Sequence, residues 1–493
     1  MAVTAETTSF PPLLTIVFGF AAAVVAILFL LKKKRPEDSP PTANLGIPFI
    51  GNYIEFAKNP VKFIETGLNN YGEVFTVQML HKNLTFLLGT EAATPFFSLP
   101  DDKMSQSEVY GFMTPVFGKG IVYDAEPKKR SQQMQCVGQG LRSNRLKAYV
   151  PKIEKETIEY LKKWGEKGEV NLLDALSELT ILTSSRCLHG DDVRENLFAE
   201  VARIYHDLDK GVTPISFFFP YAPIEAHRRR DSARQEMIDI FSKVIRQRRE
   251  SGDNQESRSD ILQMYIDFQY KEDGRGLTDE EIVGLLIALL FAGQHTSSIT
   301  STWTAMLLLH NPEELKKVIK EQEEIYGGDI NKIGKDSIDF DKVASMNALQ
   351  NAAKESLRMY PPLIMLMRMA LDDVETTVKG KKYVIPKGDI VFTSPAVTSR
   401  MDSLFPNADS FIPDRFNDAK QSAAFLGFGG GRHQCLGQQF GLLQVKTILS
   451  ILFRNFALES VEKEIPEPDY AAMVVGPKNR LMVRYTKLSG SVF

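Results

Sequence analysis

A cysteine near the C-terminus follows a glycine-rich segment, and this combination carries the clearest chemical signal in the sequence. Residues 425–437 have the sequence FLGFGGGRHQCLG, in which four of five consecutive positions are glycine. Glycines allow a backbone to approach a flat, bulky group closely. A helical pattern over 438–452 begins just after Cys435, so we expect the sulfur at the positive end of a helix, where the pKa of a thiol is lowered. One thiolate held behind such a loop predicts a single axial ligand, as in haem with a proximal cysteine.

Other cofactors and partners fit the sequence less well. A nucleotide-binding loop needs a Gly-Lys-Ser/Thr ending or the final glycine of GxGxxG, where this chain has Arg432. The 493 residues contain three cysteines and no CxxC, which excludes a disulfide framework, a zinc ribbon, a four-thiolate iron–sulfur site and covalent haem attachment. The 59 Lys and Arg nearly balance the 62 Asp and Glu, so nucleic acid is not expected as a partner.

One long helix is among the elements that must position this chemistry. Thr278 and Glu281 have the spacing of a capping box, and Pro312 ends the helical pattern about 32 residues later, or ~48 Å along the axis. The pattern is apolar over 282–292 and then polar over 293–302, with the sequence GQHTSSITST. A polar break inside a buried helix favours a place where small molecules and protons are handled, and an exposed helix end is the alternative interpretation.

The N-terminal region predicts a membrane anchor. Residues 13–31 are an uncharged apolar run whose nineteen residues span ~28 Å as a helix, close to the thickness of a bilayer core. A cleaved signal peptide is the alternative, although the run is longer than usual for one and Glu6 precedes it in place of a basic cluster. The basic residues 32–35 predict that everything after them is cytosolic.

We therefore expect a tail over 1–12, a transmembrane anchor over 13–31, a basic and proline-rich linker over 32–52, and one large catalytic domain over 53–493. The domain is expected to be mainly α with small β-sheets, because helical patterns dominate after residue 145. Helices are predicted over 148–164, 171–188, 225–249 and 279–309, and strands over 74–80, 84–88, 383–395 and within the last hundred residues.

Three motifs together resemble those of the cytochrome P-450 haem-thiolate monooxygenases. Residues 428–437 (FGGGRHQCLG) are similar to their haem-binding loop, 355–358 (ESLR) to their ExxR motif and 411–416 (FIPDRF) to their PERF-type segment. The resemblance covers roughly residues 45–493. It implies a single haem-thiolate domain of the cytochrome P-450 fold, with haem b bound through Cys435. It also implies a buried ion-pair network formed by Glu355, Arg358 and Arg415.

A narrower resemblance is to the sterol 14α-demethylases of this family. Residues 292–298 (AGQHTSS) look like their signature in the central helix, 110–124 like their substrate-recognition loop and 361–370 like the segment that lines their pocket. His433 also stands where other branches of the family carry arginine. The resemblance implies three successive oxygenations of the sterol 14α-methyl group, each using O₂ and two electrons. The methyl group leaves as formate, and a C14–C15 double bond remains.

The same resemblance implies roles for individual residues. Thr296 would position O₂ and protons and His295 would relay protons, with a satisfied structural imidazole as the alternative for His295. Arg130 departs from the pattern of the family, which carries its basic haem contact about a turn later, where this chain has Met134-Gln135. The implied haem contacts are Tyr123, Arg130, Arg368, Phe428, Gly429, His433 and Gly437. The implied substrate-binding residues are Tyr110, Phe112, Met113, Phe117, Ala288, Phe291, Met367, Met473 and Val474.

The resemblance also implies partners and a substrate preference. Electrons are expected from NADPH through a separate NADPH-cytochrome P-450 reductase, with cytochrome b5 as a further candidate donor, because the chain has no Rossmann fingerprint. A sterol and the lipid of the endoplasmic reticulum membrane are the other expected partners. Phe112 is typical of plant-type members, which prefer 4α-monomethyl sterols such as obtusifoliol to lanosterol. The alternatives are a microsomal haem-thiolate monooxygenase acting on fatty acids or xenobiotics, and a non-catalytic membrane-anchored sterol or haem carrier.

Overall fold

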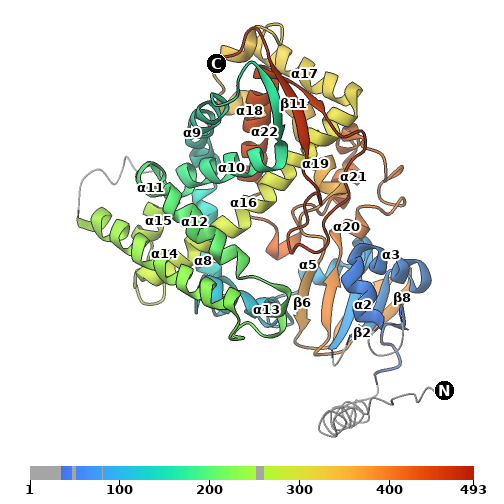
Figure 1. The fold of residues 1–493 in the computed structure, drawn as a ribbon. Helices are drawn as coiled ribbons and strands as arrows, with labels where there is room; N and C mark the ends of the chain where they lie inside the picture. Colours follow the sequence, from blue (N-terminus) through green and yellow to red (C-terminus); the bar gives the residue numbers. More distant parts are fainter. Residues whose placement is uncertain (1–34, 47–50, 80–81, 251–259) are drawn as a thin grey trace, which may run out of the picture.

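The structure is a computed structural model of the chain and describes residues 35–46, 51–79, 82–250 and 260–493. The predicted N-terminal tail and membrane anchor, 1–12 and 13–31, lie outside the described residues. The described part is mainly helical (Figure 1). A six-stranded and a two-stranded sheet lie together at the lower right of the view, and a three-stranded sheet lies at the top. The predicted fold class is confirmed.

A single long helix, α16 (Asp279–His310), runs through the middle of the molecule (Figure 1). Its start is the predicted capping box, in which Thr278 Oγ1 accepts the N–H of Glu281 at 3.2 Å and the Glu281 carboxylate accepts the N–H of Thr278 at 2.9 Å. The helix is long and apolar enough to cross a membrane, yet most of it is buried inside the molecule. It is therefore a core helix, as its apolar first half predicts.

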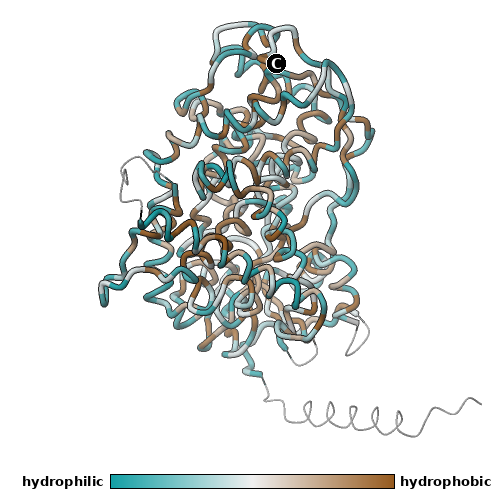
Figure 2. Tube along the Cα trace, turned by 60° about the vertical axis from the view of Figure 1, so that its left-hand side comes forward, coloured by the Kyte–Doolittle hydropathy of each residue, from teal (hydrophilic) through white to brown (hydrophobic). Residues whose placement is uncertain are grey.

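The helices that pack on α16 build the main hydrophobic core. The most extensive contacts come from α10 (Leu172–Ser184), α14 (Glu225–Glu250), α19 (Asn347–Met359) and α22 (Gln438–Asn455). Apolar segments gather in the interior and hydrophilic segments at the periphery (Figure 2). The other α-helices of the described part are α2 (Gly51–Lys58), α3 (Pro60–Tyr71), α4 (Gly89–Ala92), α5 (Thr94–Ser98), α6 (Ser107–Tyr110), α7 (Thr114–Phe117), α8 (Pro127–Gly140), α9 (Ser143–Leu161), α11 (Asp191–Asn196), α12 (Phe198–Lys210), α13 (Pro214–Phe218), α15 (Ile261–Asp267), α17 (Pro312–Tyr326), α18 (Phe340–Ser345), α20 (Pro395–Thr398) and α21 (Ala419–Ala424).

The largest sheet has the strand order β1-β2-β3-β9-β6-β4, and the smaller ones are β10-β11-β5 and β7-β8. In the largest sheet, β1 pairs with β2 and β3 pairs with β9 in parallel, and the other neighbours are antiparallel. The strands are β1 (Thr42–Ala43), β2 (Val74–Met79), β3 (Lys82–Leu87), β4 (Met104–Ser105), β5 (Lys167–Asn171), β6 (Leu366–Ala370), β7 (Val374–Val378), β8 (Lys381–Ile385), β9 (Ile390–Thr393), β10 (Phe456–Ser460) and β11 (Met482–Lys487).

Most of the predicted elements are confirmed, and five strands were not predicted. The helices α9, α10 and α14 match the predicted ranges within a few residues, and β2 and β3 match the early strands. The additional strands are β1, β4, β5, β6 and β7. The polar sequence of β5, KGEVN, has no strand pattern of its own, and its extended form comes from antiparallel pairing with β11.

Part of the predicted linker over 32–52 lies against the largest sheet. Thr42 and Ala43 form β1, which pairs with β2. The Arg35 guanidinium donates to the Asp389 carboxylate at 2.9 Å and to the hydroxyl of Thr76 at 3.1 Å. These contacts fix the direction in which the chain enters the folded domain.

Candidate active site

The cysteine loop owes its shape to two glycines in the left-handed backbone region. Gly429 and Gly431 have φ angles of +67° and +61°, which other residues rarely adopt. A Cβ on Gly431 would lie 2.0 Å from the carbonyl oxygen of Phe97 in α5, so the loop packs directly on that helix. The N–H of Cys435 donates to the carbonyl oxygen of Phe428 at 2.9 Å. The loop therefore places the cysteine at a defined position just before α22.

The Cys435 thiol is accessible but is not acidified by its surroundings. Burial raises the pKa of the thiol, and the nearby N–H groups of Gly437 and Gln438 lower it by less. The prediction of a lowered pKa is wrong for the protein alone, because desolvation outweighs the helix terminus. A bound metal ion deprotonates a thiol outright. The raised pKa of Cys435 therefore disfavours a free thiolate but does not oppose its role as a metal ligand. Residues Cys136 and Cys187 are buried, which leaves Cys435 as the cysteine that a ligand can reach.

Glu355, Arg358 and Arg415 form a buried network of ion pairs. The Glu355 carboxylate accepts from Arg358 Nε at 2.7 Å and Nη2 at 2.9 Å, and from Arg415 Nε at 2.9 Å. It also accepts the N–H of Ile412 at 2.9 Å, and Arg358 Nη1 donates to the carbonyl oxygen of Ser399 at 2.8 Å. The side chains of Glu355 and Arg358 are fully buried. The network ties α19 to the segment just before the cysteine loop.

A group of cationic side chains gathers around Asp101. Its carboxylate is paired with Arg130 and with His433 Nε2, the latter at 2.8 Å. Burial would raise the pKa of Asp101, but the charge of Arg130 and the hydrogen bonds from His433 and Arg130 hold it below the usual value. Arg368 is also buried, and its Nε and Nη1 have no hydrogen-bond acceptor among the described residues. Burial lowers its pKa to about 10. The positive charge of the two guanidinium groups thus exceeds the single negative charge of Asp101. This group of side chains can therefore pair with further anionic groups.

The polar part of α16 borders open space. Ala292 is exposed and the residues on either side are partly exposed, although the helix is buried before and after them. A Cβ on Gly293 would meet no atom within 4 Å. The hydroxyl of Thr296 donates to the carbonyl oxygen of Ala292 at 2.7 Å. One residue further on, Ser297 Oγ lies 3.7 Å from the position of a Cβ on Gly441 in α22, so this part of α16 lies beside the helix that follows Cys435.

His295 has a partner that sequence reasoning did not find. Its Nε2 lies 3.1 Å from a carboxylate oxygen of Asp209 in α12. About a third of each side chain is exposed. The pair therefore joins the polar part of α16 to solvent. Nothing local in the sequence points to Asp209, because the two residues lie 86 positions apart.

An aromatic wall, defined here as Tyr110, Phe112, Phe117, Tyr123 and Phe291, extends from the loop of residues 110–123 to α16, which carries Phe291. Tyr110 stacks on Tyr123 at a centroid distance of 4.8 Å, and its hydroxyl accepts the N–H of Met367 at 3.3 Å. Phe117 lies 5.8 Å edge-on to Phe291 of α16. Met113 is buried and Ala288 partly buried in the same core. Most of the implied substrate-binding residues thus lie together.

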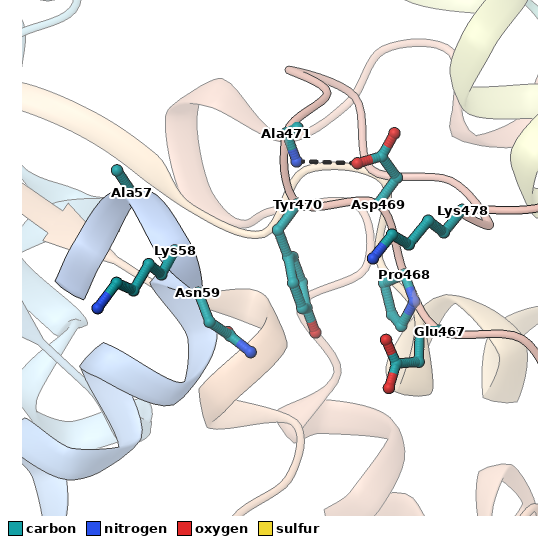
Figure 3. Close-up of a pocket in the computed structure, with 9 residues that line it drawn as sticks. All are labelled: Ala57, Lys58, Asn59, Glu467, Pro468, Asp469, Tyr470, Ala471 and Lys478. Carbon is teal, nitrogen blue, oxygen red and sulfur yellow. Dashed lines mark hydrogen bonds between the residues drawn. The ribbon is translucent and has the colours of Figure 1, made fainter. Parts of the chain in front are cut away.

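Met473 differs from the other implied substrate-binding residues. Its side chain is 51 % exposed, and Val474 is partly buried. Near them Tyr470 lines a surface cavity of about 450 Å³ between the end of α2 and the segment from Glu467 to Lys478 (Figure 3). The nine lining residues are mostly polar, and none belongs to the cysteine loop, to α16 or to the aromatic wall. This cavity is therefore separate from the candidate active site.

These residues fit a haem group. Cys435 offers one accessible sulfur ligand, and the polar part of α16 borders open space. The unpaired N–H groups of Arg368, together with Arg130 and His433, suit the carboxylates of two propionates. Tyr123 lies beside them, stacked on Tyr110. A haem-thiolate centre requires a single cysteine ligand and a distal pocket with suitably placed polar groups. Cys435 and the polar part of α16 offer these two features.

The comparisons with known proteins agree with this class of site. The family model for cytochrome P-450 matches residues 40–484, and the chain belongs to the cytochrome P-450 family of monooxygenases. The retinoic acid bound cyanobacterial CYP120A1 has the same fold, with a TM-score of 0.77 and 21% identity over 91% of this chain and 99% of that chain.

Relatives that match over nearly the whole length of the chain show which members of the family it is similar to. The chain is 44% identical to a sterol 14-demethylase of Arabidopsis thaliana, over 96% of both chains. It is 46% identical to an obtusifoliol 14-alpha demethylase of Triticum aestivum, over 91% of this chain and 98% of the relative. A lanosterol 14-alpha demethylase of Mus musculus is 40% identical, over 94% of this chain and 91% of the relative.

Proposed function

We propose that this monooxygenase is a sterol 14α-demethylase of sterol biosynthesis. The observation that carries the proposal is its 40–46% identity, over nearly the whole length, to relatives that bear this activity in their names. The site agrees, because an aromatic wall with few polar groups suits a ligand that is mostly hydrocarbon. Three oxygenations convert the 14α-methyl group to an alcohol, then to an aldehyde, and finally release it as formate with formation of a C14–C15 double bond.

Haem, when bound to Cys435 and to the group of Arg130, Arg368, His433 and Tyr123, supplies the activation of O₂. Each oxygenation consumes one O₂ and two electrons, which we assign to NADPH through a separate reductase, with cytochrome b5 as an auxiliary donor. The chain itself must bind the sterol, exclude bulk water and deliver protons. The Glu355 network ties α19 to the segment that precedes the cysteine loop.

Proton delivery is assigned to the Asp209–His295 pair and to Thr296. The pair reaches solvent on one side, and its histidine is the residue next to Thr296 on α16. The Thr296 hydroxyl donates its proton to the carbonyl oxygen of Ala292 in this structure, and it can turn to donate toward the open space. A proton taken up by Asp209 thus has a short path through His295 to the place where oxygen is reduced.

The preferred substrate is proposed to be a 4α-monomethyl sterol of the obtusifoliol type. The support is the volume of Phe112, whose ring lies in the aromatic wall. Packed against the A-ring of a bound sterol, this ring would leave no space for a second methyl group at C4. Overpacking a tight apolar site costs about 1–3 kcal/mol. The obtusifoliol 14-alpha demethylase of wheat is also more similar to this chain than the lanosterol enzyme of mouse. We further propose that residues 13–31 anchor the enzyme in the endoplasmic reticulum membrane.

A reconstituted reaction tests the proposal. The full-length protein, a plant NADPH-cytochrome P-450 reductase and NADPH are combined in phospholipid vesicles with obtusifoliol, lanosterol, lauric acid or no substrate. We expect a sterol product that lacks the 14α-methyl group and carries a new double bond, with obtusifoliol consumed faster than lanosterol. A Cys435→Ala variant serves as the control for catalysis that is not due to this site. Conversion of lauric acid alone, with both sterols unchanged, would contradict the proposal.

A further inference from the structure

Phe112, the ring proposed to select the sterol, is itself in contact with a ring from a distant segment. Phe217 on α13 has its ring centroid 5.6 Å from that of Phe112, with 59° between the ring planes. Tyr110 is the second aromatic neighbour, at 6.2 Å. The position of the Phe112 ring therefore depends on α13 as well as on its own loop.

The helix that carries Phe217 is firmly held. The hydroxyl of Ser216 lies 2.9 Å from Nε2 of His227 in α14, and the buried Arg230 donates to the carbonyl oxygen of Pro220 at 3.0 Å. Both His227 and Arg230 are almost completely buried. Anchored in this way, α13 cannot follow Phe112 if that ring is displaced, so Phe217 acts as a fixed support.

A cation from the largest sheet adds to this support. The Nζ atom of Lys82, at the start of β3, lies 5.4 Å from the centroid of the Phe217 ring. Such a contact favours one orientation of the ring. A continuous series of contacts therefore runs from Lys82 through Phe217 and Phe112 to Tyr110 and Tyr123.

We propose that Phe217 is a positioning residue for substrate specificity, because it holds the Phe112 ring in the place where a second C4 methyl group would have to lie. The inference rests on the proposed function and deepens it. If Phe217 is removed, Phe112 gains room to withdraw, and a 4,4-dimethyl sterol then fits. We expect the effect of Phe217 to pass through Phe112, because the two rings are in direct contact.

Competition between the two sterols tests this inference. Equimolar obtusifoliol and lanosterol are given to the reconstituted full-length enzyme, and the ratio of their kcat/KM values is measured. An aromatic pair contributes enough that Phe217→Ala should lower this ratio about two- to tenfold, and Phe217→Leu should lower it by less. The matched control is Phe219→Ala, because Phe219 lies on the same segment but is 67 % exposed. Its ratio should stay at that of the wild type.

A double variant separates positioning from a general weakening of the fold. Because Phe217 acts through Phe112, the combination Phe112→Leu with Phe217→Ala should have the same ratio as Phe112→Leu alone. The reduced carbon monoxide spectrum of each variant reports whether the haem site is intact. An unchanged ratio in Phe217→Ala, or fully multiplicative effects in the double variant, would overturn the inference and leave the proposed function standing. A wild type that prefers lanosterol would overturn the proposed sterol preference and the inference together.

Discussion

Replacing Glu355 by glutamine tests the role of the buried network behind the cysteine loop. In the wild type this carboxylate is paired with two guanidinium groups, from Arg358 and Arg415, at 2.7 and 2.9 Å, in an almost completely buried site. Glutamine keeps the shape but leaves both cations buried and uncompensated. Removing one partner of a buried ion pair costs about 3–5 kcal/mol. The variant Glu355→Gln should therefore lose stability and haem together.

The expected change in melting temperature follows from the size of the chain. With an unfolding entropy of about 2.1 cal/mol/K per residue, a chain of 493 residues has about 1 kcal/mol/K in total. A loss of about 3–5 kcal/mol then lowers the melting temperature by about 3–5 °C. The assay is differential scanning calorimetry at one fixed scan rate, together with the haem content of the purified protein.

A surface ion pair provides the matched control for this experiment. Glu313 and Lys316 are 2.7 Å apart, but their side chains are 80 % and 72 % exposed. Such pairs contribute about 0–1 kcal/mol, so Glu313→Gln should melt within about 1 °C of the wild type. If Glu355→Gln also melts within 1 °C and keeps its full complement of haem, the reasoning about the buried network is wrong.

Four further outcomes are expected. Cys435→His should retain some haem but lose the red-shifted Soret band of the reduced carbon monoxide complex, and an unchanged band would refute the ligand assignment. Substituting His295 or Thr296 by alanine should slow product formation by about 10²–10⁴, while the dissociation constant of the sterol changes only a few-fold. A collapse of sterol binding would show instead that both side chains serve in packing. Phe112→Leu should raise activity on lanosterol relative to obtusifoliol about tenfold in the competition assay, and no shift would refute the volume argument. Burial tends to raise the pKa of Glu281, but hydrogen bonds from Arg275 and Lys129 lower this pKa to about 2. The ionised carboxylate therefore stabilises the folded protein fully above pH ~4.5, and this stabilisation is lost as the pH falls toward 2. In urea titrations at several pH values, Glu281→Gln should lack this part of the acid-induced loss, and an identical pH profile in both proteins would contradict the assignment.

Features with a local cause could be predicted from the sequence. The capping box at Thr278 and the helix that follows it depend on residues within one turn, and the structure reproduces them. The residues of the aromatic wall and the Glu355 network came from a resemblance to known motifs, and the structure brings each set together. The mainly helical fold followed from the same kinds of signal.

Features that depend on distant partners could not be predicted. Asp101 pairs with His433 across 332 positions of the chain, and β5 is extended because it pairs with β11. The support of Phe112 by Phe217 is a tertiary contact of the same kind. The pKa of the Cys435 thiol was predicted in the wrong direction, because a helix terminus can be recognised in the sequence and the burial that opposes it cannot.

Following the fate of the 14α-methyl carbon tests the central claim most directly. Obtusifoliol labelled with ¹³C at this methyl group is given to the reconstituted enzyme, and formate, NADPH consumption and sterol products are quantified. We predict that the label is recovered as formate, with three NADPH oxidised for each formate in fully coupled turnover, and that the remaining sterol has a C14–C15 double bond. Label that stays in a hydroxylated sterol, with no formate released, would contradict the account.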